Sequence, residues 1–130
     1  MTNEPIDLRA VLKTFDDLWS PRIAARINDY DVRVTHVAGS YIWHVHDNTD
    51  EFFLVLDGEL SIALRDPDER VVSLTPGTVF VVPRGIYHRP FSDAGADIVV
   101  IDPANTPTTG DTHDPLPDHI KTHTGIAIDQ

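Results

Sequence analysis

The stretch WHVHDNTDEFFLVLDGEL, which runs from Trp43 to Leu60, indicates both a fold and a site. It begins with an H-x-H pair, His44 and His46, and Glu51 follows after four polar residues. An unbroken apolar run then ends at an Asp-Gly pair. Residues i and i+2 of a strand point to the same face, so we expect the two imidazoles to lie side by side.

This pattern has two interpretations. Neutral imidazoles and a carboxylate are good ligands for a transition metal, and a polar turn before Glu51 would bring its carboxylate to the histidines. A buried pair of histidines that are hydrogen-bonded to strand carbonyls would give the same local sequence. The H-x-H pair alone therefore does not establish a metal site.

Turn signals and short apolar runs alternate through the middle of the chain. Strands at intervals of about 8–12 residues are typical of an antiparallel sandwich or barrel. The run Phe52–Leu56 is apolar at every position, so we expect both faces of that strand to be covered. The predicted strands are Val32–Val37, Phe52–Leu56, Leu60–Leu64, Val71–Leu74, Val79–Val82 and Ile98–Ile101.

Two turns have specific sequence signatures. Asp57-Gly58 suits a type I′ hairpin, in which both central residues take positive φ. The segment Thr75–Thr78 (TPGT) suits a type II turn, because proline fixes one φ and glycine accepts the positive φ at the next position.

The two ends of the chain differ from this β-rich middle. Ile6–Trp19 has apolar residues at helical spacing, with Asp7 as N-cap and Ser20-Pro21 as the stop, which predicts an amphipathic helix packed on the outside of the fold. Residues 103–130 are dense in Pro, Thr, Gly and Asp, which predicts an irregular arm ordered by packing on the domain or on a second subunit. The arm contains three histidines, for which a solvated role is favoured over a second metal site: His113, His119 and His123.

Length, composition and charge exclude several classes of function. A chain of 130 residues suffices for one domain, and its lack of cysteine excludes disulfides and cysteine ligands or nucleophiles. A net charge of −11 would repel a phosphate backbone, so we expect no nucleic-acid partner. No apolar run approaches the roughly 20 residues that cross a bilayer, and the N-terminus is acidic and polar. We therefore expect a cytoplasmic protein without membrane contact.

A second motif supports the metal interpretation. In the segment from Pro76 to Ser92, PGTVFVVPRGIYHRPFS, a proline ends a strand, Gly85 permits a sharp turn and His88 follows three residues later. Such a turn would point His88 inward from an opposite hairpin. Three imidazoles and one carboxylate would leave open coordination positions, which catalysis at a metal requires.

The two motifs together resemble those of the cupin superfamily. Gly39, His44, His46, Glu51 and Gly58 are similar to the first cupin motif, although four residues rather than five separate Gly39 from His44. The second motif is matched by Gly77, Pro83, Gly85 and His88, with Ser92 in place of the usual asparagine. Within the family, the likeness is to small single-domain bacterial cupins of the kind described as mannose-6-phosphate isomerase-like (RmlC-like). Thr108–Asp111 resembles the end of the same pattern.

The resemblance implies an all-β fold, a double-stranded β-helix (jelly roll) barrel with a short N-terminal helix. The expected division is a helix in residues 1–22, a cupin barrel in residues 23–102 and the arm in residues 103–130. The implied ligands of one divalent transition metal (Fe, Mn, Ni, Zn or Cu) are His44, His46, Glu51 and His88.

Other residues near these motifs have both a functional and a structural interpretation. His36 either points into the barrel or is a core histidine bonded to a carbonyl. Arg84, Tyr87 and Arg89 flank His88 and either bind an anionic substrate or form a solvated rim. The aromatic residues, for which packing is the favoured interpretation, are Tyr41, Trp43, Phe53 and Phe91.

The resemblance leaves the function open between two classes. The first is a metal-dependent enzyme that acts on a small molecule, such as a dioxygenase or a sugar isomerase-like enzyme. The alternative is a non-catalytic, metal-loaded module that binds or senses a small ligand. The general acid/base candidates that would favour an enzyme are Tyr87, His36 and Asp50, and none is compelling. The apolar strand faces exceed what one barrel and one helix cover, so we expect a homodimer.

Overall fold

The structure is a computed structural model that describes residues 4–128, and β-strands dominate it. The described residues form one short helix, α1 (Leu8–Leu12), and ten strands. The strands are β1 (Arg22–Ile27), β2 (Tyr30–Ser40), β3 (His44–Val45), β4 (Glu51–Gly58), β5 (Leu60–Arg65), β6 (Glu69–Leu74), β7 (Val79–Val82), β8 (Tyr87–Pro103), β9 (Thr112–His113) and β10 (Ile126–Ala127).

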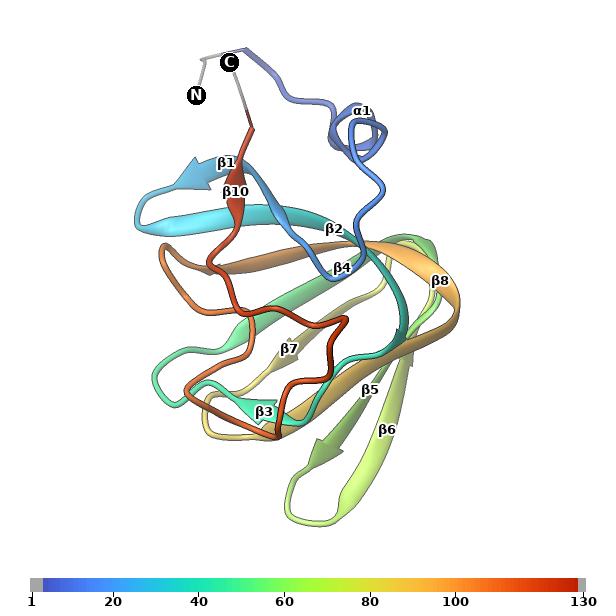
Figure 1. Ribbon diagram of the computed structural model, residues 1–130, viewed down its shortest axis with the longest axis vertical. Helices are drawn as coiled ribbons and strands as arrows, with labels where there is room; N and C mark the ends of the chain where they lie inside the picture. Colours follow the sequence, from blue (N-terminus) through green and yellow to red (C-terminus); the bar gives the residue numbers. More distant parts are fainter. Residues whose placement is uncertain (1–3, 129–130) are drawn as a thin grey trace.

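The long strand β8 organises the barrel. Its first half, Tyr87–Phe91, pairs with β5, and its second half, from Ala96 to Pro103, pairs with β2 on one side and β4 on the other. Strand β6 extends the first sheet next to β5, and β7 extends the second next to β4. The two sheets therefore share one strand and curl around a common interior (Figure 1), which confirms the predicted all-β jelly roll barrel.

The apolar residues divide into two clusters, one inside the barrel and one outside it. The inner cluster contains Val37, Val55, Ile62 and Ile98, which are all fully buried. The outer cluster lies between α1 and the sheet and consists of Val11, Leu12, Phe15, Val34 and Val99.

Strand β4 contributes to both clusters, with Phe53 and Val55 inside and Leu54 and Leu56 outside. The outer pair is only partly buried, because the helix that covers it is short. The expectation that both faces of β4 are covered is therefore met only in part.

The predicted N-terminal helix is shorter than expected. Asp7 is the N-cap, as predicted, and its side chain accepts hydrogen bonds from the backbone N–H groups of Arg9 and Ala10. The helix ends at Leu12, and the backbone carbonyls of Leu12 and Phe15 both accept from the His36 side chain. These contacts take carbonyls that a longer helix would use internally.

The predicted turns have different outcomes. The Thr78 N–H donates to the Thr75 carbonyl at 2.9 Å and Gly77 has φ +84°, which confirms the type II turn. The type I′ hairpin at Asp57-Gly58 is wrong, since only Gly58 has positive φ and β4 and β5 do not pair with each other. Both strands pair with β8 instead, so the chain passes from one sheet to the other at this point. A side chain on Gly58 would collide with the backbone of Gly95 and Ala96.

Strand β1 was not predicted. Its sequence, RIAARI, alternates weakly and carries two arginines, so it lacks the apolar run by which the other strands were found. Strand β1 pairs with β2 in antiparallel fashion and with β10 in parallel fashion.

The C-terminal segment crosses the barrel in an extended path (Figure 1) and is tied to it at several points. Strand β9 pairs with β3, and β10 pairs with β1. Ile120 is 1% exposed and belongs to the inner cluster. Gly110 lies so close to β3 that a side chain there would overlap the Val45 carbonyl. No helix within residues 4–128 has the length and hydropathy to span a membrane.

Candidate metal centre

Four side chains from three strands and one loop meet at one end of the barrel. His44 lies in β3 and His46 directly follows it, while Glu51 begins β4 and His88 is the second residue of β8. His44 and His88 are directly opposite each other in the antiparallel pairing of β3 and β8. The segment between His46 and Glu51 is a polar connection, as the sequence predicted, and it turns the chain back toward the imidazoles.

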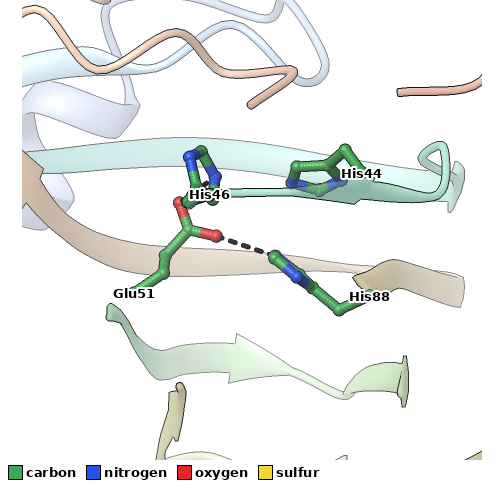
Figure 2. A group of neighbouring side chains, drawn as sticks. All are labelled: His44, His46, Glu51 and His88. Carbon is green, nitrogen blue, oxygen red and sulfur yellow. Dashed lines mark hydrogen bonds and ion pairs between the residues drawn. The ribbon is translucent and has the colours of Figure 1, made fainter. Parts of the chain in front are cut away.

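The four side chains are buried and point toward a common centre (Figure 2). One side-chain nitrogen or oxygen from each residue lies within 4.8 Å of the corresponding atoms of the other three. Ligands opposite each other on a metal are about 4.2 Å apart, given bonds of about 2.1 Å to nitrogen or oxygen. The spread of the four atoms is therefore close to that of the ligands of a single ion.

The hydrogen bonds of two histidines select the nitrogen that faces this centre. The Nδ1 atoms of His44 and His88 each lie 2.9 Å from a backbone carbonyl, of Ile42 and Ile86 respectively, to which they donate. The proton of each neutral ring is then on Nδ1, and Nε2 presents a lone pair. Metal-binding histidines are commonly oriented by this kind of contact.

His46 and Glu51 complete the set of donor atoms. The Nε2 atom of His46 is buried without a hydrogen-bond partner, 3.4 Å from Oε2 of Glu51. The other carboxylate oxygen, Oε1, lies 3.1 Å from Nε2 of His88. A metal ion at the centre would satisfy the lone pairs of both histidines and both carboxylate oxygens, so the residues fit such an ion.

Burial and mutual contact set the charge of this cluster. Burial, together with the nearby His88, lowers the pKa of His44 to about 3, so His44 is neutral at neutral pH. Burial also lowers the pKa of His46, but contact with Glu51 outweighs that effect and the net pKa is raised. Burial disfavours the Glu51 carboxylate, yet its contacts with His46 and His88 hold its pKa well below the usual value. The cluster is thus a carboxylate among imidazoles, which suits a cation.

A pocket of about 50 Å³ adjoins the cluster, and His44 and Glu51 form part of its wall. Apolar and aromatic side chains line most of the pocket, together with a few polar groups, as in many small-molecule sites. Tyr41 lies edge-on to His44, with 5.3 Å between the ring centroids, and burial raises the pKa of its hydroxyl to about 12. Thr108, from the C-terminal segment, lines the same pocket.

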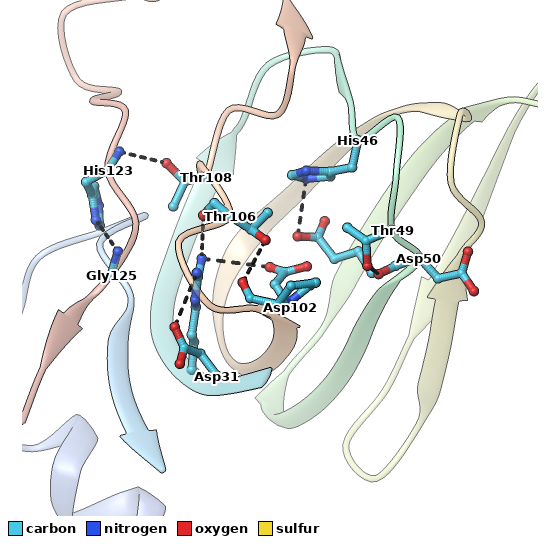
Figure 3. A network of polar contacts seen from close by, with 12 residues as sticks. Asp31, His46, Thr49, Asp50, Asp102, Thr106, Thr108, His123 and Gly125 are labelled. Atoms are coloured by element: carbon cyan, nitrogen blue, oxygen red, sulfur yellow. Dashed lines mark hydrogen bonds and ion pairs between the residues drawn. The ribbon is translucent and has the colours of Figure 1, made fainter. Parts of the chain in front are cut away.

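Sequence reasoning missed a buried ionic group in this wall. Arg33 is 1% exposed, and its Nη1 atom donates to the Thr106 carbonyl at 3.1 Å. Its guanidinium lies 3.7 Å from a carboxylate oxygen of Asp31 and 3.8 Å from one of Asp102. Figure 3 shows Asp102 and Thr106 between β2 and the site histidine His46. Burial and the nearby Glu51 carboxylate raise the pKa of Asp102 well above its usual value.

The register of β2 explains this omission. Asp31, Arg33 and Thr35 point into the barrel, whereas the apolar Val34 packs outside against α1. An alternating strand is normally read with its apolar side inward. Asp31 and Asp102 are direct partners across β2 and β8, and two paired acidic residues indicate a basic residue such as Arg33 between them. This indication appears only when the strand register is known.

His36 lies outside the barrel, so the interpretation that it points inward is wrong. Its Nδ1 atom is 2.6 Å from Oδ1 of Asp97, and its Nε2 is 2.7 Å from the Leu12 carbonyl. Burial lowers the pKa of His36, but these acceptors outweigh that effect and the net pKa is raised. The residue joins the helical segment to the sheet.

The residues around His88 lie on the rim. The Arg84 N–H donates to Asp50 at 2.9 Å, and the side chains of both residues are exposed. Tyr87 is exposed, and the Arg89 guanidinium lies 5.2 Å from the centre of the Phe91 ring. Phe53 and Tyr41 are core residues that also line the pocket, whereas Trp43 stacks under Arg65 at 3.8 Å.

The C-terminal histidines do not form a second cluster within residues 4–128. The one group of three or more metal-binding side chains found there is His44, His46, Glu51 and His88. His113 and His119 are exposed, and His123 is partly buried beside the backbone of Thr108 and Gly125.

A jelly roll barrel with three histidines and a glutamate converging at one end is the arrangement expected of a metal-binding cupin. Residues 32–102 match the family model of the cupin domain, and the chain belongs to that family.

Known proteins similar to the chain include one from Bacillus subtilis (strain 168), the uncharacterised protein YdbB. The two are 37% identical over 65 residues, which is 50% of this chain and 56% of that protein. A cupin-2 domain protein from Shewanella frigidimarina has the same fold, with 37% identity, a TM-score of 0.72 and coverage of 75% of this chain and 93% of the other. Hydroquinone 1,2-dioxygenase PnpCD, solved with Fe³⁺, has a TM-score of 0.69 at 20% identity, over 78% of this chain and 32% of its own.

Proposed function

We propose that His44, His46, Glu51 and His88 hold one divalent transition metal, and that the protein acts on or binds a small molecule at that metal. The observation that carries this proposal is the arrangement of lone pairs. The Nδ1 atoms of His44 and His88 are committed to backbone carbonyls, and Nε2 of His46 is buried without a partner. Three nitrogens and one oxygen suit Fe, Mn, Ni, Zn or Cu and leave positions open for a ligand.

The chemistry of such a site follows from its surroundings. A divalent metal held there supplies a Lewis acid for an oxygen atom of the bound molecule. Glu51 reduces the positive charge at the centre, while the apolar wall of the pocket excludes water. Asp102 and Tyr41 adjoin the pocket, so they replace Tyr87, His36 and Asp50 as the groups that an enzyme would use to move a proton.

The enzymatic version of this proposal is a dioxygenase or a sugar isomerase-like enzyme. Support for a dioxygenase comes from the hydroquinone 1,2-dioxygenase that shares the fold. The pocket volume of about 50 Å³ favours a small substrate. The alternative is a metal-loaded binding or sensing module, which would use the same pocket without turnover.

Metal analysis tests the first part of the proposal. Protein purified without an affinity resin should contain close to one transition metal per chain by inductively coupled plasma mass spectrometry. A metal content near zero after incubation with each of the five ions would overturn it. Oxygen-uptake and isomerisation assays of each metal form then separate enzyme from binding module, since the module would bind ligand without turnover.

We propose a homodimer, because Val71, Val79 and Val81 are exposed on the outer faces of β6 and β7. A monomeric mass by light scattering at micromolar concentration would contradict it. The division at residues 22 and 102, the mannose-6-phosphate isomerase-like subtype and a cytoplasmic location are likewise proposed from the sequence.

A further inference from the structure

The pocket beside the metal centre contains buried hydrogen-bond donors that the protein itself does not use. Arg33 is 1% exposed and Tyr41 is 7% exposed, and both line the pocket together with His44 and Glu51. The Nε and Nη2 atoms of Arg33 and the Tyr41 hydroxyl have no partner at hydrogen-bonding geometry. Most buried polar groups in proteins are paired, so unpaired donors that line a pocket next to a metal site indicate a ligand.

The acidic neighbours of Arg33 lie too far away to occupy these donors. Its nearest carboxylate oxygens, on Asp31 and Asp102, are 3.7 and 3.8 Å away. Charge-assisted hydrogen bonds are about 2.7–2.9 Å long, so these are loose ion pairs. The one hydrogen bond of the guanidinium goes from Nη1 to the Thr106 carbonyl. Arg33 is thus held in place at one nitrogen and is free to donate at the other two.

The unpaired atoms define the chemistry of the ligand. The free nitrogens of Arg33 can only donate and the Tyr41 hydroxyl can also donate, so one acceptor group can satisfy them together, and a carboxylate fits a planar guanidinium. One unpaired acceptor, Oδ1 of Asp102, is available for a hydroxyl group. The volume of about 50 Å³ corresponds to roughly three to five water-sized spheres of 10–15 Å³ each, so the bound molecule has few atoms.

We propose that Arg33 and Tyr41 bind the carboxylate of a small aliphatic hydroxy acid, whose hydroxyl side faces Asp102 and the metal centre. This subsite names the ligand class for the proposed function and rests on it. The competing explanation is that Arg33 only ties β2 to the Thr106 carbonyl and the two aspartates. Only the first explanation expects the protein to bind a carboxylate more tightly than a neutral molecule of the same shape.

The test uses glycolate as the probe and glycolamide as its neutral isostere, with zinc-loaded protein and isothermal titration calorimetry. Glycolate should bind at least about tenfold more tightly than glycolamide, since hydrogen bonds to a charged group are the stronger ones. Equal affinities, or no binding of glycolate, would overturn the subsite.

Two variants and one control test whether Tyr41 and Arg33 are the residues that distinguish glycolate from glycolamide. Tyr41→Phe removes the unpaired hydroxyl and keeps the ring that packs on Trp19, so it should weaken glycolate binding about tenfold. Arg33→Lys keeps a positive charge beside Asp31 but loses the planar donors, and it should weaken binding by a similar factor or more. The matched control is Tyr30→Phe, at an exposed position of the same strand, which should bind glycolate as the unmodified protein does.

Failure of this inference is distinguishable from failure of the metal proposal. Metal content is measured for every variant before the titration, and it should equal that of the unmodified protein. Full metal content with unchanged glycolate affinity in both the Tyr41 and the Arg33 variant would overturn the subsite alone. If the protein takes up no metal, Arg33-dependent discrimination would still support the subsite, and the absence of metal would separately contradict the metal centre.

Discussion

His44 and His88 are direct partners across antiparallel strands β3 and β8, and their ring centroids are 4.2 Å apart. Their pairing makes the geometry of the site a property of the strand register. A slip of one residue would send one imidazole to the opposite face of the sheet. Whatever fixes β3 against β8 therefore also fixes the candidate metal centre.

Replacing Glu51 with glutamine should remove most of the metal. The variant keeps the size of the side chain but loses the one charged donor of the cluster, whose pKa is already held low by His46 and His88. We expect metal content to fall by about tenfold or more, judged from the 10- to 100-fold losses seen when groups that merely support metal ligands are changed. Mass spectrometry of metal in protein freed of unbound ions checks this. Glu59→Gln, at an exposed position just beyond the far end of β4, is the control and should keep its metal.

Acid should release the metal before it unfolds the protein. Metal binding requires neutral imidazoles. As the pH falls, His46 takes up a proton before His44, because the pKa of His46 is raised and that of His44 is about 3. Apparent affinity should drop by about tenfold per pH unit below the pKa of His46. Dialysis near pH 5, followed by metal analysis and circular dichroism, tests the order of events. Metal content that is unchanged at pH 5 would contradict the prediction.

Gly110→Ala should destabilise both the fold and the site. Gly110 has φ +72° and faces the Val45 carbonyl, so a methyl group would strain the backbone and push the C-terminal segment away from β3. We expect a loss of about 2–4 kcal/mol in the free energy of unfolding and a lower metal content. Gly77→Ala is the matched control, because Gly77 has φ +84° but open space around it, and it should lose only about 1 kcal/mol. Equal losses in urea unfolding would show that contact with β3 is unimportant.

The contact between His36 and Asp97 should make stability depend on pH. Both ring nitrogens of His36 face only acceptors, so the folded state favours the doubly protonated ring and its pKa is raised. The stabilisation is complete below about pH 6.5, the pKa in the unfolded chain, and disappears as the pH rises through the higher folded value.

Asp97→Asn should reduce this pH-dependent stabilisation, by about 1 kcal/mol at pH 6 and by much less at pH 9. Urea unfolding in the presence of a chelator at the two pH values measures the difference without a contribution from metal. Asp93→Asn, at an exposed position of the same strand, should change neither value. A loss for Asp97→Asn that is equal at both pH values would refute a protonated His36.

The sequence was informative where spacing alone determines geometry. The H-x-H pair and the glycine and proline positions around His88 predicted side chains that the fold does bring together. Each predicted strand run falls within an observed strand, but the prediction missed β1 and covered only the segment Ile98–Ile101 of the long strand β8. The hairpin at Asp57-Gly58 failed because the local turn signal competed with β8, which pairs with both flanking strands.

The polar side of the pocket was beyond the reach of the sequence pattern. Arg33 lies in an alternating strand, β2, whose apolar residues face α1. Its side chain points into the barrel because α1 covers the outer face of β2, and the sequence pattern alone does not show which face α1 covers. The same inversion placed His36 outside the barrel. These positions become predictable only when the register of β2 with β8 is known.

The match to the family model ends at Asp102, whereas Ile120 lies in the inner cluster and Thr108 lines the pocket. A chain cut after Asp102 would keep all four residues of the candidate metal centre, yet it would have a gap in its core and a pocket without one wall. A study of ligand selectivity therefore needs a chain that extends beyond residues 32–102, the range that matches the family model. The barrel motifs alone therefore do not describe the whole wall of the pocket in this chain.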